Sequence, residues 1–160
     1  RYICYSKLMS TTDKINEKVV EGLRQIVADT YALMGQTHLC HWNVEGPGFF
    51  ALHTAFEEQY TELFAAVDEI AERVRALGAY APGGLNNLAQ MAGFSELPEK
   101  TSAEAMVQSL HDQHNKIIAD AKKVSDAASE ADDKETEDLM IARIQVHEKT
   151  AWMLKSYLQG

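Results

Sequence analysis

The chain has 160 residues, of which 46% are hydrophobic and 24% are charged, and 24 acidic against 15 basic side chains give a formal net charge of −9. A chain of this length forms one domain and buries roughly 68 to 70% of its unfolded surface, so it needs neither disulfides nor a structural metal to fold. Nucleic-acid binding through bulk charge is disfavoured, because such binding depends on neutralising phosphates. An acidic surface attracts cations instead.

Two cysteines, Cys4 and Cys40, are far apart and have no metal-like spacing, which favours a reducing, cytoplasmic location. The longest uncharged run lies between Arg75 and Glu96 and is interrupted by Pro82 and several glycines. Such a run does not predict a membrane-spanning helix, so no membrane association is expected.

The N-terminal residues 1–8 lack the apolar core and cleavage site of a signal peptide. They precede Met9-Ser-Thr-Thr-Asp, which reads as a natural start, so we interpret them as an upstream or expression-derived addition. The predicted organisation is a tail over residues 1–12 and one helical domain over residues 13–160.

Four long amphipathic helices are predicted from apolar side chains that recur every three or four residues. They lie between Asp13 and Asn43, from Phe49 to Leu77, from a capping box at Thr101–Glu104 to a polar break at Ser125–Asp133, and through Met140 to Leu158. The segment from Ala79 to Lys100 is rich in Gly, Pro and Asn and predicts a crossover with a short helix over Leu85–Met91. The pattern predicts an all-α, ferritin-like four-helix bundle with a short extra helix between helices two and three.

The second predicted helix carries two pairs of metal-ligating side chains. His53 and Glu57 lie four residues apart, as do Asp68 and Glu72, so each pair shares one helix face. Eleven residues separate Glu57 from Asp68, which is roughly 16 Å along the axis, too far for one ion to bridge. If both pairs bind metal, the economical arrangement is antiparallel pairing of this helix with its copy in a two-fold related subunit.

The usual intrachain di-iron bundle needs Glu-x-x-His motifs, and none of the six histidines has a glutamate three residues before it. This further favours a site shared between subunits. Mixed histidine and carboxylate ligands suit iron, zinc or manganese rather than calcium or magnesium. The alternative is that these acids, including Asp68 and Glu72, are ordinary solvated helix surface.

The stretch from His41 to His53, HWNVEGPGFFALH, followed by Glu57 and by DEIAER from Asp68, resembles the Dps family, the DNA-binding proteins from starved cells or mini-ferritins. The similarity in pattern extends from Met9 over essentially the whole chain. It implies a cytoplasmic homo-dodecamer with ferroxidase centres between two-fold related subunits. By position, His41, His53 and Glu57 would come from one chain, and Asp68 and Glu72 from its partner.

The resemblance implies that these five residues bind iron(II) as substrate and pass electrons to hydrogen peroxide in preference to dioxygen. The ferric product would be stored inside the shell, which protects the cell against oxidative stress. Trp42 resembles the family's aromatic residue near the centre, and packing at the interface is an equally good interpretation. Zinc is expected to compete with iron for the same ligands.

Four further acids and two further histidines are candidates for supporting roles. Glu58 and Glu62 are candidates for mineral nucleation, and Asp120 and Asp126 for pores that attract iron(II), although a solvated acidic face explains each almost as well. His38 and His147 are either supplementary ligands or hydrogen-bonded groups within the bundle.

Some relatives bind DNA with a lysine-rich N-terminal tail. The corresponding region of this chain has few lysines, since only Lys14 and Lys18 lie between Met9 and Arg24. DNA binding is therefore not favoured. Two alternatives to the iron enzyme stay open: a DNA-compacting protein with incidental metal binding, and a structural helical bundle without redox chemistry.

Overall fold

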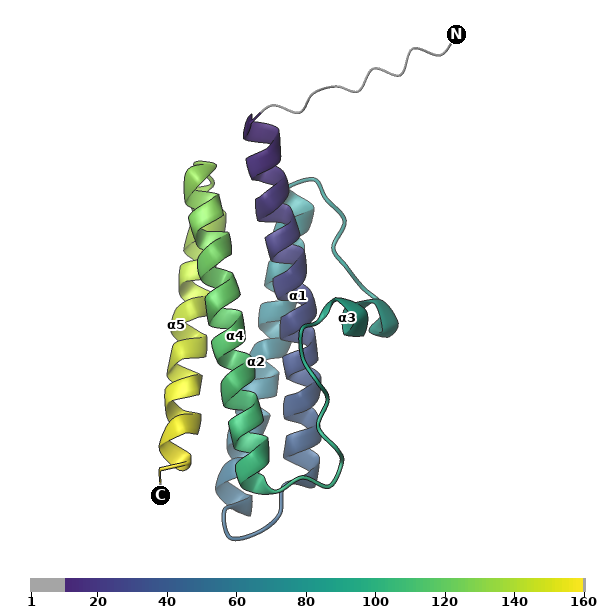
Figure 1. Ribbon diagram of the computed structural model, residues 1–160, viewed down its shortest axis with the longest axis vertical. Helices are drawn as coiled ribbons and strands as arrows, with labels where there is room; N and C mark the ends of the chain where they lie inside the picture. Colours follow the sequence, from purple (N-terminus) through teal and green to yellow (C-terminus); the bar gives the residue numbers. More distant parts are fainter. Residues whose placement is uncertain (1–10, 160) are drawn as a thin grey trace.

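The computed structural model describes residues 11–159, with side-chain environments from residue 16 onward, and consists of helices joined by turns and one crossover (Figure 1). The interpretation of residues 1–8, like Cys4, falls outside the described residues. The helices are α1 (Thr11–Asn43), α2 (Phe49–Ala76), α3 (Leu85–Met91), α4 (Ala103–Glu130) and α5 (Lys134–Tyr157). The predicted all-α bundle with a short extra helix in the crossover is confirmed.

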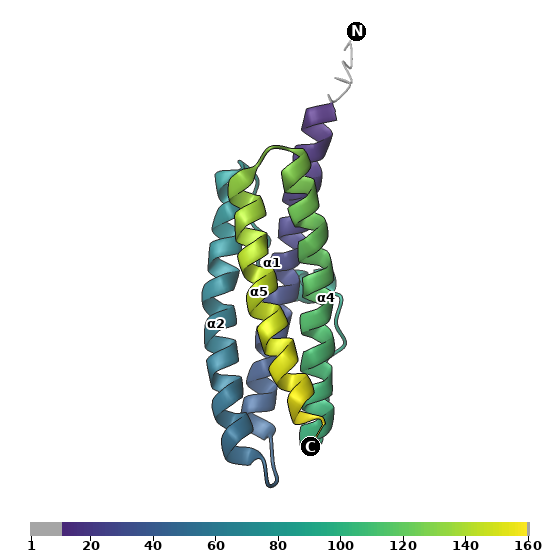
Figure 2. The ribbon, with the colours of Figure 1, turned by 90° about the vertical axis from the view of Figure 1, so that its left-hand side faces the viewer.

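Helices α1 and α2 form one antiparallel hairpin, and α4 and α5 form a second (Figures 1 and 2). The crossover runs back along the outside of the bundle, so α2 and α4 point in the same direction. Helix α1 packs against α2 and α4, α5 packs against α4 and α2, and α3 lies on α1. None of the helices in the described part of the chain is long and apolar enough to cross a membrane.

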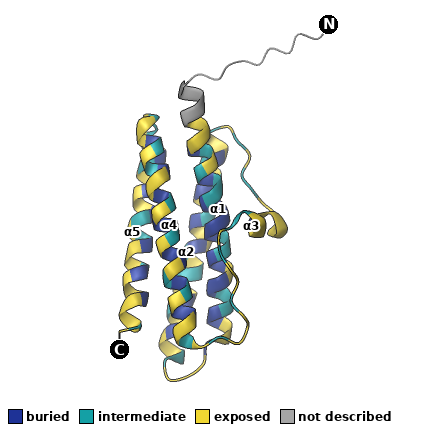
Figure 3. Ribbon diagram, in the orientation of Figure 1, coloured by how far each residue is buried: buried dark blue, intermediate teal, exposed yellow. Residues whose placement is uncertain are grey.

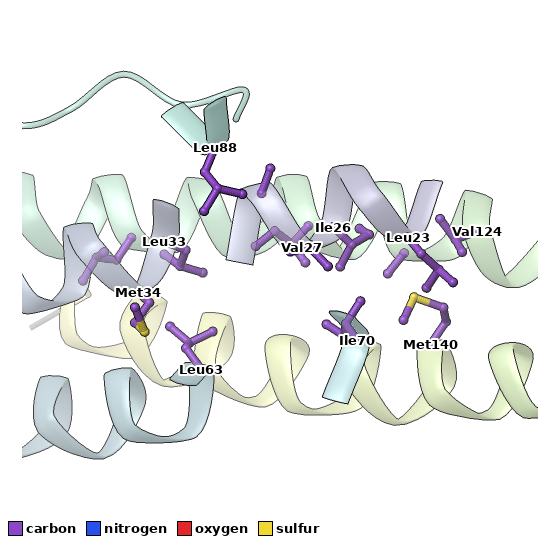
Figure 4. Packing of buried hydrophobic residues seen from close by; sticks show 14 of the residues in the cluster. Leu23, Ile26, Val27, Leu33, Met34, Leu63, Ile70, Leu88, Val124 and Met140 are labelled. Atoms are coloured by element: carbon purple, nitrogen blue, oxygen red, sulfur yellow. The ribbon is translucent and has the colours of Figure 1, made fainter. Parts of the chain in front are cut away.

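The core is a continuous column of apolar side chains from all four long helices, and α3 adds Leu88 to it from outside (Figure 4). Leu23, Ile26, Phe56 and Ile70 are completely buried. Each such side chain contributes about 1.5 to 3 kcal/mol through loss of apolar contact with water. The buried residues form one stripe on each long helix, whereas α3 is exposed over most of its surface (Figure 3). The observed stripes have the spacing from which the helices were predicted.

Two details of helix α4 differ from the sequence-based prediction. Its N-cap is Ser102, whose hydroxyl accepts a hydrogen bond from the backbone N–H of Ala105, whereas Thr101 donates to the carbonyl of Pro98. The predicted reciprocal capping box is therefore wrong. The predicted break at Ser125–Asp133 is shorter in the structure, because the helix continues to Glu130 and only residues 131–133 separate it from α5. Ala128 is fully buried in this last part, so core packing outweighs the weak helix propensity of its polar neighbours.

The crossover is fastened to α1 by a buried carboxylate. Asp29 is completely buried and accepts hydrogen bonds from the backbone N–H of Gly93, at 2.9 Å, and from Lys116 of α4, at 2.7 Å. Gln25 donates both to Asp29 and to the carbonyl of Met91. One ionised side chain thus joins α1, α4 and the crossover, and its burial is compensated by charge and hydrogen bonds.

Helices α1 and α4 approach closely at Gly22. A Cβ atom added there would lie 2.5 Å from a Cγ atom of Val124, which is itself buried. We expect Gly22→Ala to lower the free energy of unfolding by about 1 to 2 kcal/mol, since overpacking outweighs the gain in helix propensity. Gly35→Ala on the same helix is the matched control, because nothing lies within 4 Å of its added Cβ. Chemical denaturation should show opposite signs for the two variants, and equal shifts would contradict the close approach.

Candidate metal centre

The end of α1 and the start of α2 hold two histidines face to face. The rings of His41 and His53 stack with centroids 3.8 Å apart. The Nδ1 atom of each ring lies against the backbone carbonyl of the other residue, at 2.8 Å for His41 and 2.9 Å for His53. Because a carbonyl oxygen only accepts, both Nδ1 atoms must carry the proton and donate. The Nε2 lone pairs of both rings are therefore left for another partner, as in a metal-ligating histidine.

The turn between these helices brings the two histidines together. Gly46 has φ +102°, a conformation that favours glycine. A Cβ atom on Gly48 would lie 2.8 Å from the hydroxyl oxygen of Tyr157 in α5. Glycine at these positions thus permits a tight connection, and the C-terminal end of α5 packs beside it.

The three predicted carboxylate ligands, Glu57, Asp68 and Glu72, are exposed along α2. Within the described part of one chain, no three side chains of His, Cys, Asp or Glu come together in a way that could hold a metal ion. The structure thus brings together His41 and His53 but does not assemble the five predicted ligands. Glu57 lines a shallow surface groove on α2 with Glu58, Thr61 and Glu62. Asp68 and Glu72 lie further along the helix.

Aromatic rings surround the histidine pair. His38, one turn before His41, packs between Trp42, at 4.8 Å between ring centroids, and Tyr60 of α2, at 3.9 Å. Tyr60 also presents its ring at 79° to that of His41, with centroids 5.3 Å apart. Sequence reasoning missed Tyr60, although its place two turns after His53 on α2 is a signal in the sequence. A ligand role for His38 stays a prediction.

Several predicted supporting residues already have partners within the chain. Glu62 forms a two-pronged ion pair with Arg143 of α5. Asp120 accepts from Lys116 and Lys123, and although its partial burial acts in the opposite direction, these hydrogen bonds hold its pKa below the ordinary value. Their negative charges are thus balanced, which weakens the nucleation and pore interpretations for these two acids. Glu58 and Asp126 are exposed.

The buried cysteine that precedes His41 in the sequence has low reactivity. Cys40 immediately precedes His41 and is a free thiol, and burial raises its pKa to about 12. A thiol of that kind is protonated at neutral pH, so it is a poor nucleophile.

His147 lies away from the candidate centre, in the bundle core. Its Nδ1 is 2.8 Å from Nδ1 of His114 on α4, and its Nε2 is 3.3 Å from Nη2 of Arg143. Of the two roles predicted for His147, supplementary ligand or hydrogen-bonded group within the bundle, the structure shows the second. Burial lowers the pKa of His147 to about 2, with His114 and Arg143 acting in the same direction. Burial, the Arg143 charge and, less strongly, His111 lower the pKa of His114 to about 3.

A four-helix bundle with a crossover and a short extra helix defines a ferritin-like fold. The profile of the ferritin-like domain family matches residues 20–160. The chain is 36% identical to DNA protection during starvation protein 2 of Bacillus anthracis over 90% of this chain and 99% of the relative.

Solved structures agree with this assignment. A Dps protein from Bacillus brevis superposes with a TM-score of 0.88 at 37% identity, covering 94% of this chain and 99% of that one. The Dps protein from Vibrio cholerae O1, described as a member of the ferritin-like diiron-carboxylate superfamily, gives 0.87 at 28% identity, covering 99% of both chains. The chain belongs to the Dps family within the ferritin-like superfamily.

Proposed function

We propose that the chain is a ferroxidase and iron-storage mini-ferritin that oxidises iron(II), preferably with hydrogen peroxide, at sites shared between two-fold related subunits. The observation that carries the proposal is the reciprocal hydrogen bonding of His41 and His53, which uses the Nδ1 atom of each ring and leaves the Nε2 atom of each ring for a metal ion. The donor set of imidazole and carboxylate suits iron, with zinc as a competitor. Iron is the substrate and the ferric ion the product.

Completion of the site by a second copy follows from the distribution of the ligands. His41 lies at the end of α1 and His53 and Glu57 lie near the start of α2, whereas Asp68 lies roughly 16 Å further along α2 than Glu57, with Glu72 one turn beyond it. Antiparallel pairing of two α2 helices would place each set opposite the other and generate two identical sites. Exposed apolar surface near His41 supports such packing, since Trp42 is 68% exposed beside a groove that Leu39 and Leu85 also line. The dodecamer is part of the proposal.

In the proposed reaction each peroxide accepts two electrons, one from each of two iron(II) ions, and is reduced to water with two protons. The chain binds the iron(II) ions through Nε2 of His41 and His53 and through carboxylate oxygens. The Nδ1–H groups stay bonded to backbone carbonyls, so the rings keep one orientation throughout. The test is anaerobic addition of iron(II) and peroxide, with ferric absorbance and residual peroxide followed together. We expect two iron(II) ions consumed per peroxide, and unchanged peroxide would contradict the proposal.

The name of the Bacillus anthracis relative suggests a second candidate function, compaction of DNA with incidental metal binding. The formal net charge of −9 opposes it, because nonspecific DNA binding depends on basic side chains. We expect no gel shift of linear DNA at low or at moderate salt. A shift at low salt that disappears at moderate salt would favour the DNA function instead.

A further inference from the structure

A row of polar side chains crosses the bundle from the surface of α2 to the core between α4 and α5. It consists of Glu62, Arg143, His147 and His114. The Arg143 side chain is only 6% exposed, whereas that of Glu62 is 41% exposed and lies in the groove on α2. A buried guanidinium needs partners, since burying a charge costs free energy unless it is paired.

The groups around the guanidinium resemble the ligands of a metal ion more than they resemble a surface ion pair. Nη2 of Arg143 lies 3.1 Å from Oε2 of Glu62 and 3.3 Å from Nε2 of His147. Nη1 contacts the other carboxylate oxygen, and Nε, although buried, has no hydrogen-bond partner among the described residues. A carboxylate and an imidazole lone pair therefore converge on one cationic group, and that group is incompletely satisfied there.

The state of His147 follows from its contacts. An arginine N–H only donates, so Nε2 of His147 must be the acceptor, and its proton must lie on Nδ1. This Nδ1–H donates to Nδ1 of His114. His114 thus fixes the tautomer of His147, so that the Nε2 lone pair of His147 faces the guanidinium of Arg143. Outer partners hold ligating histidines in the same way in metal sites.

We propose that Arg143 acts as a resident cation in a histidine–carboxylate site formed by Glu62 and His147, and so keeps divalent metal out of the bundle interior. The proposal does not depend on the ferroxidase function. A transition metal would need ligand bonds of about 2.0 to 2.2 Å, so Glu62 and His147 would have to close by about 1 Å once the guanidinium is gone. The partly exposed Glu62 supplies an entry path, and water in the space left by the arginine would complete the coordination.

Cobalt(II) binding to purified Arg143→Ala protein tests the proposal, with calorimetry for stoichiometry and visible absorption for geometry. We expect about one more Co²⁺ per chain than in the wild type, with the intense visible bands of a low-coordinate site. Arg143→Lys, which keeps a cation, should match the wild type, as should Arg143→Ala combined with His147→Leu. Arg143→Ala combined with His114→Leu should bind the extra ion roughly 10 to 100-fold more weakly.

Absence of the extra Co²⁺ in folded Arg143→Ala would overturn the proposal, and so would its persistence after His147→Leu. If Arg143→Ala does not fold by itself, refolding from denaturant with and without Zn²⁺ decides the matter. Zinc-dependent recovery that is lost in the variant also carrying His147→Leu supports the site. Failure to recover with zinc overturns it.

Discussion

Replacing His53 or Asp68 by alanine should lower the rate of peroxide-driven iron(II) oxidation by at least about 100-fold, because loss of a direct ligand exceeds the effect of losing an outer hydrogen bond. Both side chains lie on α2, and each would serve one end of the shared site. The measurement is the initial rate of ferric absorbance at equal protein concentration. The helix should tolerate both changes, since Asp68 is exposed and His53 is only half-buried.

Matched controls separate loss of ligand from loss of structure. Glu69→Ala removes an exposed acid from the position after Asp68, and Thr54→Ala changes the exposed residue after His53. Neighbouring positions point in different directions around a helix, so both controls should retain nearly the full rate. Unimpaired oxidation in His53→Ala or Asp68→Ala would show that the ligand assignment is wrong.

Acidification should destabilise the protein through the buried pair His114 and His147. Each has a pKa near 6.5 when unfolded, but the pKa values in the folded chain are about 3 and about 2. At pH values between the folded and the unfolded pKa, the unfolded chain binds more protons than the folded chain. The free energy of unfolding therefore falls as pH falls, by about 1.4 kcal/mol per pH unit for each histidine. Between pH 6.5 and pH 4.5, protonation of the two histidines in the unfolded chain lowers the free energy of unfolding by at most about 5 kcal/mol.

A double variant, His114→Gln with His147→Gln, isolates this contribution. Glutamine amides can still hydrogen-bond to each other and accept from Arg143, but they do not take up protons in this range. Denaturant unfolding should be measured at one protein concentration, because the apparent stability of an oligomer depends on it. The wild-type curve should fall more steeply with acid than that of the variant. Parallel curves would contradict the neutral buried pair.

The fold was predictable because its main signal is periodic. Stripes such as Leu23, Ile26 and Leu33 repeat at helical spacing in the sequence, and the same residues form the core. The errors came at positions where tertiary packing decides. Helix α4 passes the polar residues after Ser125 because Ala128 is buried against the core. Ser102 rather than Thr101 caps it, a difference of one residue that the sequence motif does not resolve.

The candidate site was predictable only in part. The resemblance assigned His41 and His53 to the same chain's half of the site, and the structure places the two rings together with reciprocal hydrogen bonds. The balancing of Glu62 by Arg143 was not predictable, because the two residues are 81 positions apart and only the packing of α2 on α5 joins them. The assignment of Glu57, Asp68 and Glu72 as ligands stays a prediction, since their proposed partners belong to another copy of the chain.

Complementation between two inactive variants tests the shared site most directly. His53→Ala and Asp68→Ala chains are unfolded together, reassembled as a mixture and assayed for peroxide-driven iron(II) oxidation. In a mixed two-fold pair one site carries both substitutions and the other carries neither, so random pairing should restore about one quarter of the wild-type rate. Each variant reassembled alone should stay inactive. A mixture no more active than its components would contradict a site built from two chains.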